Sequence, residues 1–312
     1  MQFIRKTNIQ FMKVRKYAYA FSLTLITISI VSLILHGGPR YNIDFTGGTL
    51  IQLKFENPVK IKDIRAALTA KGFKDAEIKH FGNPREVVVR LGILGAKQEL
   101  STEIENIIQT KISDNPFTVE RVEKVGPKIG HELILDAIKA IFWSMVLILI
   151  YVMWRFEFKF SIGAIVALMH DVTITMGVFS VFNIEISSPI IAALLTIVGY
   201  SLNDTIVVYD RIRENLKTLK KGSAELANTV NRSINETLSR TIITSGTTLL
   251  VVVVLYFFGG EVLRNFALAL IVGIGIGTYS SIFIASPIVV DWEWKTHKAH
   301  REKLKAAAHT HK

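Results

Sequence analysis

The chain has 312 residues, and half of them are hydrophobic, yet 37 Lys and Arg against 26 Asp and Glu leave a formal charge of +11. Soluble nucleic-acid-binding domains of this charge have a negative mean hydropathy, whereas the value here is +0.36. The composition therefore predicts a membrane protein with basic loops and argues against nucleic acid as a partner. The chain has no cysteine, which excludes disulfides, cysteinyl metal sites and thiol nucleophiles.

Six apolar stretches are long enough to cross a bilayer, which takes about 20 residues. After the first, the sequence His36-Gly37-Gly38-Pro39-Arg40 lacks a small-x-small cleavage site, which favours an uncleaved anchor over a signal peptide. The other spans are expected at 136–154, 162–182, 189–209, 242–258 and 262–290. The predicted organisation is a cytoplasmic N-terminus (1–16), a first span (17–36), a folded domain (37–135), a five-span bundle (136–290) with a cytoplasmic loop (210–241), and a basic cytoplasmic tail (291–312).

Lys and Arg predict the orientation of the spans. Six spans place both termini on one side, and the loops predicted on that side are rich in Lys and Arg. The opposite short loops, 183–188 and 259–261, contain neither residue, so both termini are predicted to be cytoplasmic. Glu185 is expected to be solvated in one of these short loops. The basic loop 210–241 is expected to lie on the membrane surface against anionic headgroups of the lipid bilayer.

The segment between the first two spans has the pattern of a small α+β domain. Residues 51–55, 76–81, 86–91 and 117–125 are typical of strands, and apolar residues at helical spacing predict helices after Pro58 and over 98–112. The order β-α-β-β-α-β predicts a ferredoxin-like arrangement. No catalytic constellation is evident in it, so binding or mechanical coupling is favoured over chemistry. The fold class is thus a six-helix membrane protein with a ferredoxin-like domain between helices 1 and 2.

The block NIDFTGGT precedes the first predicted strand. Its two glycines permit a tight turn with positive φ after an Asp, and the segment is equally consistent with a hinge or with a simple turn. A phosphate-binding loop is disfavoured because no Gly-Lys-Ser/Thr follows. The candidate hinge residues are Asp44, Phe45, Thr46, Gly47 and Gly48.

Three ionisable residues inside or at the edge of spans are functional candidates, since burying charge in a bilayer costs several kcal/mol. They are Asp171, Asp204 and Arg240. Asp204 and Arg240 are expected at similar depth and could pair, which suits a proton-accepting site. The alternatives are snorkelling for Arg240 and a helix-packing hydrogen bond of Asp171 with His170 or a Thr. The supporting polar residues are Tyr200, Asn203, Thr205, Thr244, Thr247 and Thr248.

Several blocks resemble the signature blocks of the SecF members of the SecD/SecF family, within the resistance-nodulation-division (RND) superfamily. The three longest are Asn42–Thr49 (NIDFTGGT), Val198–Asn215 (VGYSLNDTIVVYDRIREN) and Arg240–Thr248 (RTIITSGTT), and Leu168–Thr173 (LMHDVT) and Phe258–Gly260 (FGG) fit as well. The resemblance runs from about residue 5 to residue 295. It implies half of an RND-type bundle, completed by a heterodimer with SecD.

The resemblance further implies an accessory, non-enzymatic subunit of the Sec protein-export machinery in the bacterial inner membrane, with residues 37–135 in the periplasm. Its implied partners are SecD, the SecYEG channel, a YajC-type accessory subunit and the translocating preprotein. The proton-motive force would drive translocation after SecA action. Asp204 and Arg240 match the functional Asp and Arg of the family, and Asp171 matches a further residue. No cofactor or metal is implied; the coupling ion is a proton, and a carboxylate among hydroxyls suits Na⁺ equally.

Three other functions are weighed beside this one. An intramembrane aspartyl protease would use Asp171 and Asp204 as a dyad, but these are expected at different depths and no Gly-x-Gly-Asp occurs. A small-molecule exporter of the RND type would need a larger external domain than about 90 residues. A purely structural partner of SecD would tolerate neutral substitution of both Asp204 and Arg240.

Overall fold

The protein is described by a computed structural model, which covers residues 7–92, 100–217 and 223–293. Six helical spans in it are long and apolar enough to cross a membrane, which confirms the predicted number. The last of them, Gly260–Glu293, begins as α9 (Gly260–Ser280) and contains the π-helical turn η1 (Ser281–Ala285). The other five helices are α1 (Phe11–Leu35), α5 (Pro127–Arg155), α6 (Phe158–Val181), α7 (Ser188–Lys217) and α8 (Ser223–Phe258).

The part of the chain outside the helix bundle is the predicted ferredoxin-like domain. Its strands form one antiparallel sheet in the order β2-β3-β1-β4, with both helices inserted in the β-α-β-β-α-β sequence. Residues 98 and 99 of the second predicted helix lie outside the described residues. The elements are β1 (Gly48–Phe55), α3 (Ile61–Ala70), β2 (Glu77–Phe81), β3 (Asn83–Leu91), α4 (Leu100–Lys111) and β4 (Phe117–Val125).

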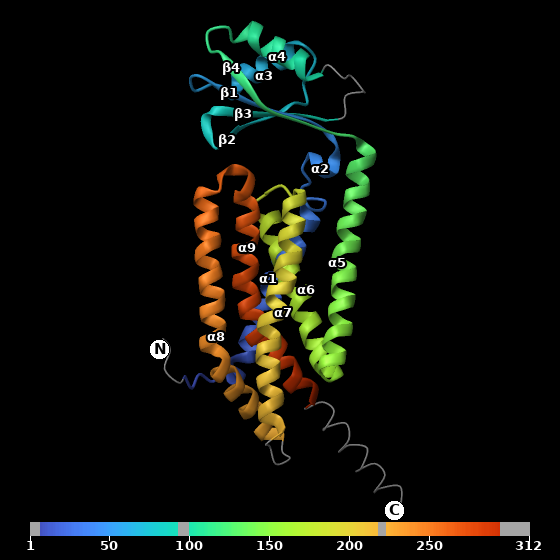
Figure 1. The fold of residues 1–312 in the computed structure, drawn as a ribbon. Coiled ribbons are helices and arrows are strands. Elements are labelled where there is room, and N and C mark those ends of the chain that lie inside the picture. Colours follow the sequence, from blue (N-terminus) through green and yellow to red (C-terminus); the bar gives the residue numbers. More distant parts are fainter. Residues whose placement is uncertain (1–6, 93–99, 218–222, 294–312) are drawn as a thin grey trace, which may run out of the picture.

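The two faces of the sheet have different neighbours. Alternate residues of β1 and β3, such as Ile51, Leu53 and Val89, are buried against α3 and α4, as the period of two predicts. The opposite face is turned toward the membrane helices (Figure 1). We call the end of the bundle beneath this face the domain end, and the other end, where α1 begins and α7 ends, the distal end.

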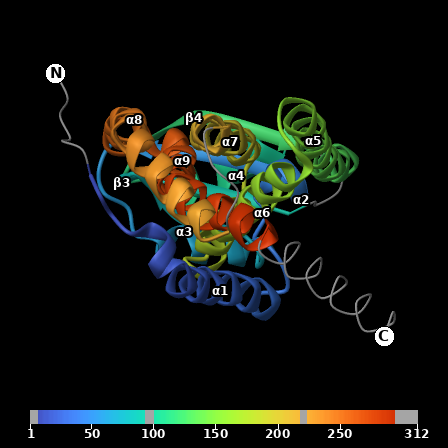
Figure 2. The ribbon, with the colours of Figure 1, turned by 90° about the horizontal axis from the view of Figure 1, so that it is seen from below.

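The membrane helices are arranged around α7, which packs against α6, α8 and α9. Figure 2 shows α1 and α5 at opposite margins of this group. α1 lies against α6 so closely that a Cβ on Gly177 would stand 2.7 Å from the Cα of Ser29. Small residues therefore set the α1–α6 distance, as they do in many membrane helix pairs.

The segment expected as a cytoplasmic loop, 210–241, is largely helical. α7 runs to Lys217 and α8 begins at Ser223, so only residues 218–222, which lie outside the described part, separate the two helices. The physical reason is a stripe of Val230, Ile234 and Leu238, each four residues apart, buried on the side of α8 that faces the bundle.

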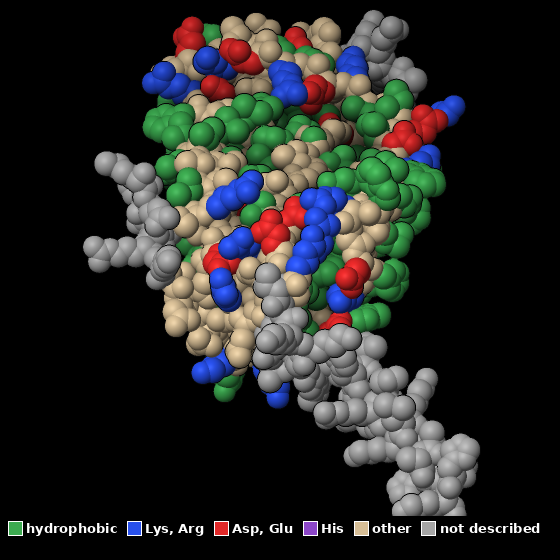
Figure 3. Space-filling view, turned by 60° about the horizontal axis from the view of Figure 1, so that its bottom comes forward, with side chains coloured by type: hydrophobic (Ala, Val, Ile, Leu, Met, Phe, Trp, Pro, Cys, Tyr) green, Lys and Arg blue, Asp and Glu red, His purple; other side chains and the backbone are tan. Residues whose placement is uncertain are grey.

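Several of the described charges at the distal end are paired with charges of the opposite sign. Figure 3 shows Lys and Arg side chains interspersed with Asp and Glu over this end. Arg211 of α7 binds both Glu214 and Glu236, and Arg155 of α5 binds Asp210. The predicted contact of this segment with anionic headgroups stays a prediction. Most of the predicted basic tail, from residue 294 on, lies outside the described residues.

Candidate functional site

Asp204 lies on the side of α7 that faces α8, and the residue is 2% exposed. Its Oδ2 accepts a hydrogen bond from Ser245 Oγ of α8 at 3.1 Å. Ser245 Oγ in turn accepts from Thr278 Oγ1 of α9 at 2.8 Å. A carboxylate and two hydroxyls thus form a polar row across three helices, inside the membrane bundle.

No direct ion pair joins Arg240 to Asp204 in the described part of the chain, although the guanidinium is near enough for an electrostatic interaction with that carboxylate. The reason is the rotation of α8. Its buried stripe includes Thr241 and Ser245, and it is Ser245 that meets Asp204. Arg240 precedes Ser245 by five residues, which places it about 140° away on the helix, and it is exposed. Similar depth predicted the pairing, but depth alone does not define which side of a helix faces a neighbour.

The supporting polar residues also differ in whether they contact a neighbouring helix. Tyr200 joins α7 to α8, because its hydroxyl donates to Thr248 Oγ1 at 3.4 Å. The hydroxyls of the three threonines on α8 donate to carbonyls of their own helix, as is common for Thr inside spans. Thr205 is buried, whereas Asn203 is exposed beside it.

Asp171, on α6, is 1% exposed and has more partners than Asp204. Its Oδ2 accepts from Ser201 of α7 at 2.5 Å and from Ser280 of α9 at 2.8 Å. Its Oδ1 lies 2.8 Å from His170 Nδ1, which confirms the expected contact with that residue. Asp171 therefore connects three helices. Ser280 is the last residue before the π-turn η1, a type of irregularity that is frequent at functional sites.

The serines that bind the two carboxylates were not among the residues predicted from the sequence. Ser201 precedes Asp204 by three residues and Ser245 follows Thr241 by four, so helical spacing alone was a usable signal for both. No helical spacing indicated Ser280, because its hydrogen bond to Asp171 depends on how α9 packs beside α6. No cluster of three His, Asp or Glu side chains suited to a metal occurs within residues 7–92, 100–217 and 223–293.

The candidate hinge segment is a compact junction between α1 and the sheet. Asn42 caps the short helix α2 (Ile43–Thr46) by accepting from Asp44 N, and Thr46 Oγ1 donates back to the carbonyl of Asn42. Gly47 and Gly48 follow with φ of 72° and 130°, a region that favours glycine. A Cβ on Gly48 would stand 2.4 Å from the carbonyl oxygen of Leu91.

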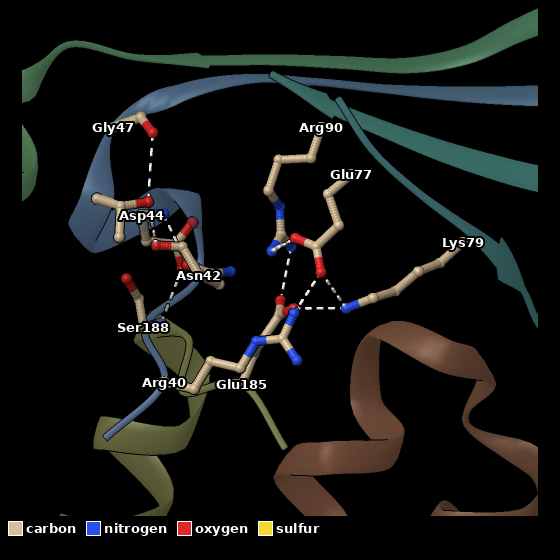
Figure 4. A network of polar contacts seen from close by, with 10 residues as sticks. Arg40, Asn42, Asp44, Gly47, Glu77, Lys79, Arg90, Glu185 and Ser188 are labelled. Carbon is tan, nitrogen blue, oxygen red and sulfur yellow. Dashed lines mark hydrogen bonds and ion pairs between the residues drawn. The ribbon is translucent and has the colours of Figure 1, made fainter. Parts of the chain in front are cut away.

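This junction also contacts the bundle. Asp44 Oδ2 accepts from the backbone N of Ser188, the first residue of α7, at 2.8 Å (Figure 4). Phe45 is buried at the same place, and its carbonyl approaches α5 so closely that Gly130 has no room for a Cβ. The described geometry is that of a packed turn; bending at this hinge stays a prediction.

The expectation that Glu185 is solvated is wrong. Its side chain is 15% exposed and belongs to a group that we call the ionic cluster: Arg40, Glu77, Lys79, Arg90 and Glu185 (Figure 4). Glu185 binds Arg90 at 2.7 Å, Lys79 at 2.8 Å and Arg40 at 3.2 Å. Burial alone would raise the pKa of Glu185, but the bonds to Arg90 and Lys79 outweigh it and lower the pKa to about 2.

The second carboxylate of the ionic cluster is Glu77 on β2. It binds the same three cations, with Lys79 at 2.8 Å, Arg90 at 3.3 Å and Arg40 in direct contact. Burial opposes ionisation of Glu77 as well, but Lys79 and Arg40 keep its pKa below the ordinary value. No sequence pattern indicates this arrangement, because its members come from four separate segments of the chain.

These features define a six-span membrane protein with a ferredoxin-like domain docked on one end and two carboxylates held by hydroxyls inside the bundle. Residues 105–295 match the family described as protein export membrane protein SecD/SecF, C-terminal, and residues 33–59 match the SecD/SecF GG motif. The chain belongs to the SecD/SecF family. The GG motif coincides with the junction around Gly47 and Gly48.

Curated relatives and solved structures agree with this assignment. The protein translocase subunit SecF of Desulfurispirillum indicum is 47% identical over 96% of this chain and 97% of its own, and that of Vibrio alginolyticus is 48% identical over 91% and 89%. A crystal structure of SecDF from Thermus thermophilus, described as a translocon-associated membrane protein, matches with a TM-score of 0.82 at 46% identity. That match covers 92% of this chain but 39% of the SecDF chain, and it confirms the predicted fold class.

Proposed function

We propose that this chain is an accessory subunit of the protein-export machinery, which converts ion movement through its membrane bundle into movement of the ferredoxin-like domain. The observation that supports this most directly is Asp204, buried at 2% exposure with a single hydroxyl donor among the described residues. A carboxylate in such a place is costly and marks ion pathways in membrane proteins. Membership in a family of protein export membrane proteins is the reason to assign this movement to protein export.

A SecD-type subunit is the proposed partner in the membrane. One face of α7 exposes small and polar residues, namely Ala192, Thr196, Gly199 and Asn203. The outward face of α8 likewise exposes Arg240 and Thr247. Lipid chains do not satisfy the Asn203 amide or the Arg240 guanidinium, whereas the helices of a second subunit do, and Ala192 and Gly199 allow close approach. The SecDF chain is more than twice as long as this one, so the region that matches this chain is joined there to further sequence.

In the proposed mechanism, Asp204 takes up and releases the coupling ion. While ionised, its carboxylate only accepts, here from the Ser245 hydroxyl; once protonated, it also carries a donor, and in the proposal the row Asp204–Ser245–Thr278 rearranges to give that donor an acceptor. Because the row spans three helices, such a change alters how α7, α8 and α9 pack. Arg240 would approach the site from the partner side, where a second carboxylate of SecD is the matching charge. An environment of oxygen atoms suits H⁺ and Na⁺ alike.

The remaining assignments follow from the same proposal. The chain would act beside the SecYEG channel with a YajC-type subunit, in the bacterial inner membrane, on preproteins that SecA has already engaged. Both termini would be cytoplasmic and the ferredoxin-like domain periplasmic. An aspartyl protease is not favoured, because no hydrogen bond joins Asp171 and Asp204 among the described residues, as a shared-proton dyad requires.

The test is preprotein translocation into vesicles that contain the chain with SecD and SecYEG, under separate H⁺ and Na⁺ gradients. Asp204→Asn is expected to abolish stimulation by the effective ion while assembly remains normal. Asp210→Asn is the matched control, since Asp210 lies on the same helix but is partly exposed and paired with Arg155 at the distal end. Full stimulation in Asp204→Asn would refute the ion-coupling role and favour a structural subunit.

A further inference from the structure

The loop that connects α6 to α7, residues 182–187, is the point where the membrane bundle meets the ferredoxin-like domain. α6 carries Asp171 and α7 carries Asp204, so the loop ends on both candidate helices. A connection this short does not absorb a relative displacement of the helices it joins. Any movement between α6 and α7 at the domain end therefore moves Glu185.

Glu185 is bound to two strands of the domain at once. Lys79 comes from β2 and Arg90 from β3, and both lie on the sheet face that is turned toward the bundle (Figure 4). Arg90 is opposite Glu77 in the β2–β3 pairing, which holds the second carboxylate beside the same cations. The cluster thus contains three cations and two carboxylates, and Glu185 is the carboxylate that the membrane part contributes.

The backbone beside Glu185 is also tied to the chain leading into the domain. Ile186 N donates to the carbonyl of Arg40 at 2.7 Å, and Asn42 N donates to the carbonyl of Ile186 at 3.0 Å. These bonds fix where the loop lies, but they contact the linker before α2 and not the sheet. The bonds of the Glu185 carboxylate reach the sheet itself.

We propose that Glu185 is the positioning residue through which displacement of α6 and α7 is transmitted to the sheet of the ferredoxin-like domain. The inference rests on the proposed ion-driven function, and it names the contact by which that function would reach the domain. Without Glu185, three cations share one carboxylate, and the partly buried Arg90 loses its shortest ion pair. The sheet then has no ionic attachment to the loop. Packing of the Gly82 turn against Glu261, at the start of α9, keeps the domain near the bundle.

The first experiment measures the position of the domain. Spin labels at Asn106→Cys in α4 and Val262→Cys in α9 report the distance between the domain and the bundle, in the full chain reconstituted in nanodiscs with cysteine-free SecD. Both sites are exposed, and the chain has no other cysteine. A single narrow distance distribution is expected, and Glu185→Lys is expected to broaden it about twofold.

Two further variants make this measurement decisive. Adding Lys79→Glu to Glu185→Lys exchanges the charges and is expected to restore the narrow distribution. Glu132→Lys, which reverses a carboxylate exposed on α5, is the matched control and is expected to leave it unchanged. Equal distributions in Glu185→Lys and Glu132→Lys would overturn the positioning role.

The second experiment separates this inference from the proposed function. Ion uptake into vesicles and stimulation of preprotein translocation are measured in parallel. Glu185→Lys is expected to keep ion uptake within about twofold of the wild type and to lose at least fivefold in stimulation, whereas Asp204→Asn loses both. Undiminished stimulation in Glu185→Lys overturns the inference alone. Undiminished uptake and stimulation in Asp204→Asn overturn the proposed function, and the distance measurement still decides what Glu185 does.

Discussion

Asp171 and Asp204 are both buried carboxylates in adjacent helices, but their surroundings differ. Asp171 has contacts with Ser201, Ser280 and His170, which occupy both of its oxygens. Asp204 accepts from Ser245 alone in the described part of the chain. A carboxylate whose acceptor sites are filled is suited to holding helices together, whereas one with free acceptor capacity is suited to taking up an ion. Burial by itself therefore does not identify the coupling residue.

The largest expected difference is in stability. Asp171→Ala leaves two serine hydroxyls and a histidine without their acceptor, at about 1–3 kcal/mol each, so we expect a loss of about 3 kcal/mol or more. Asp204→Ala affects only Ser245 and should cost about 1 kcal/mol. Unfolding of the two variants in the same detergent measures the difference. Equal losses would show that the number of donors does not separate the two sites.

The next difference is in the coupling of ion movement to translocation. Here substitution of Asp204 is expected to have the larger effect, and substitution of Asp171 the smaller one. Asp204→Asn removes the group proposed to carry the ion, so stimulation of translocation should fall at least tenfold. Asp171→Asn keeps an acceptor oxygen for the serines and should fall less than about threefold. Translocation assays with protein levels matched by immunoblot compare the two. A tenfold loss in both variants would place Asp171 on the ion path as well.

A smaller difference is expected between substitutions of the serines that bind the two carboxylates, Ser280 and Ser245. Ser280→Ala removes one of the donors to Asp171, and we expect a loss of about 1 kcal/mol with little change in coupling. Ser245→Ala removes the donor to Asp204 and breaks its link to Thr278, so a similar loss of stability should come with an altered pH dependence of stimulation. Unfolding and pH profiles of both variants provide the measurement. Identical pH profiles would contradict the assignment of Ser245 to the ion site.

The sequence predicted what depends on local patterns, and it failed where three-dimensional rotation decides. Hydropathy located six spans, and the period-two pattern located the four strands, because each depends only on neighbours along the chain. Asp171 and Asp204 stood out because charge is rare inside spans. The hydrogen-bond donor to Asp204 was missed, since it is the rotation of α8 that turns Ser245 toward the carboxylate. Glu185 was mistaken because its partners are 95 to 145 residues away in sequence, on β2, β3 and the linker after α1.

The smallest expected effect concerns pH at the ionic cluster. The pKa of Glu185 is about 2 in the docked form and near 4.5 when the carboxylate is free, so its contribution to docking is complete above about pH 4.5 and is lost as pH falls toward 2. The pKa of Glu77 is lowered in the same direction. The label distance should therefore not change between pH 8 and pH 5 through these groups. High salt should broaden it, because screening shortens the Debye length from about 8 Å at 0.15 M to about 3 Å at 1 M.

The pH dependence of the label distance also tests whether Asp171 and Asp204 have separate roles. The control background replaces the histidines near the domain end, His36 at the end of α1, His80 on β2 and His131 near the start of α5, each by Gln. A distance change that persists there cannot arise in the ionic cluster and must originate in the bundle. If Asp204→Asn then removes the change and Asp171→Asn does not, the ion site and the helix-holding site are separate. Loss of the change in both variants would instead make the two carboxylates one coupled unit.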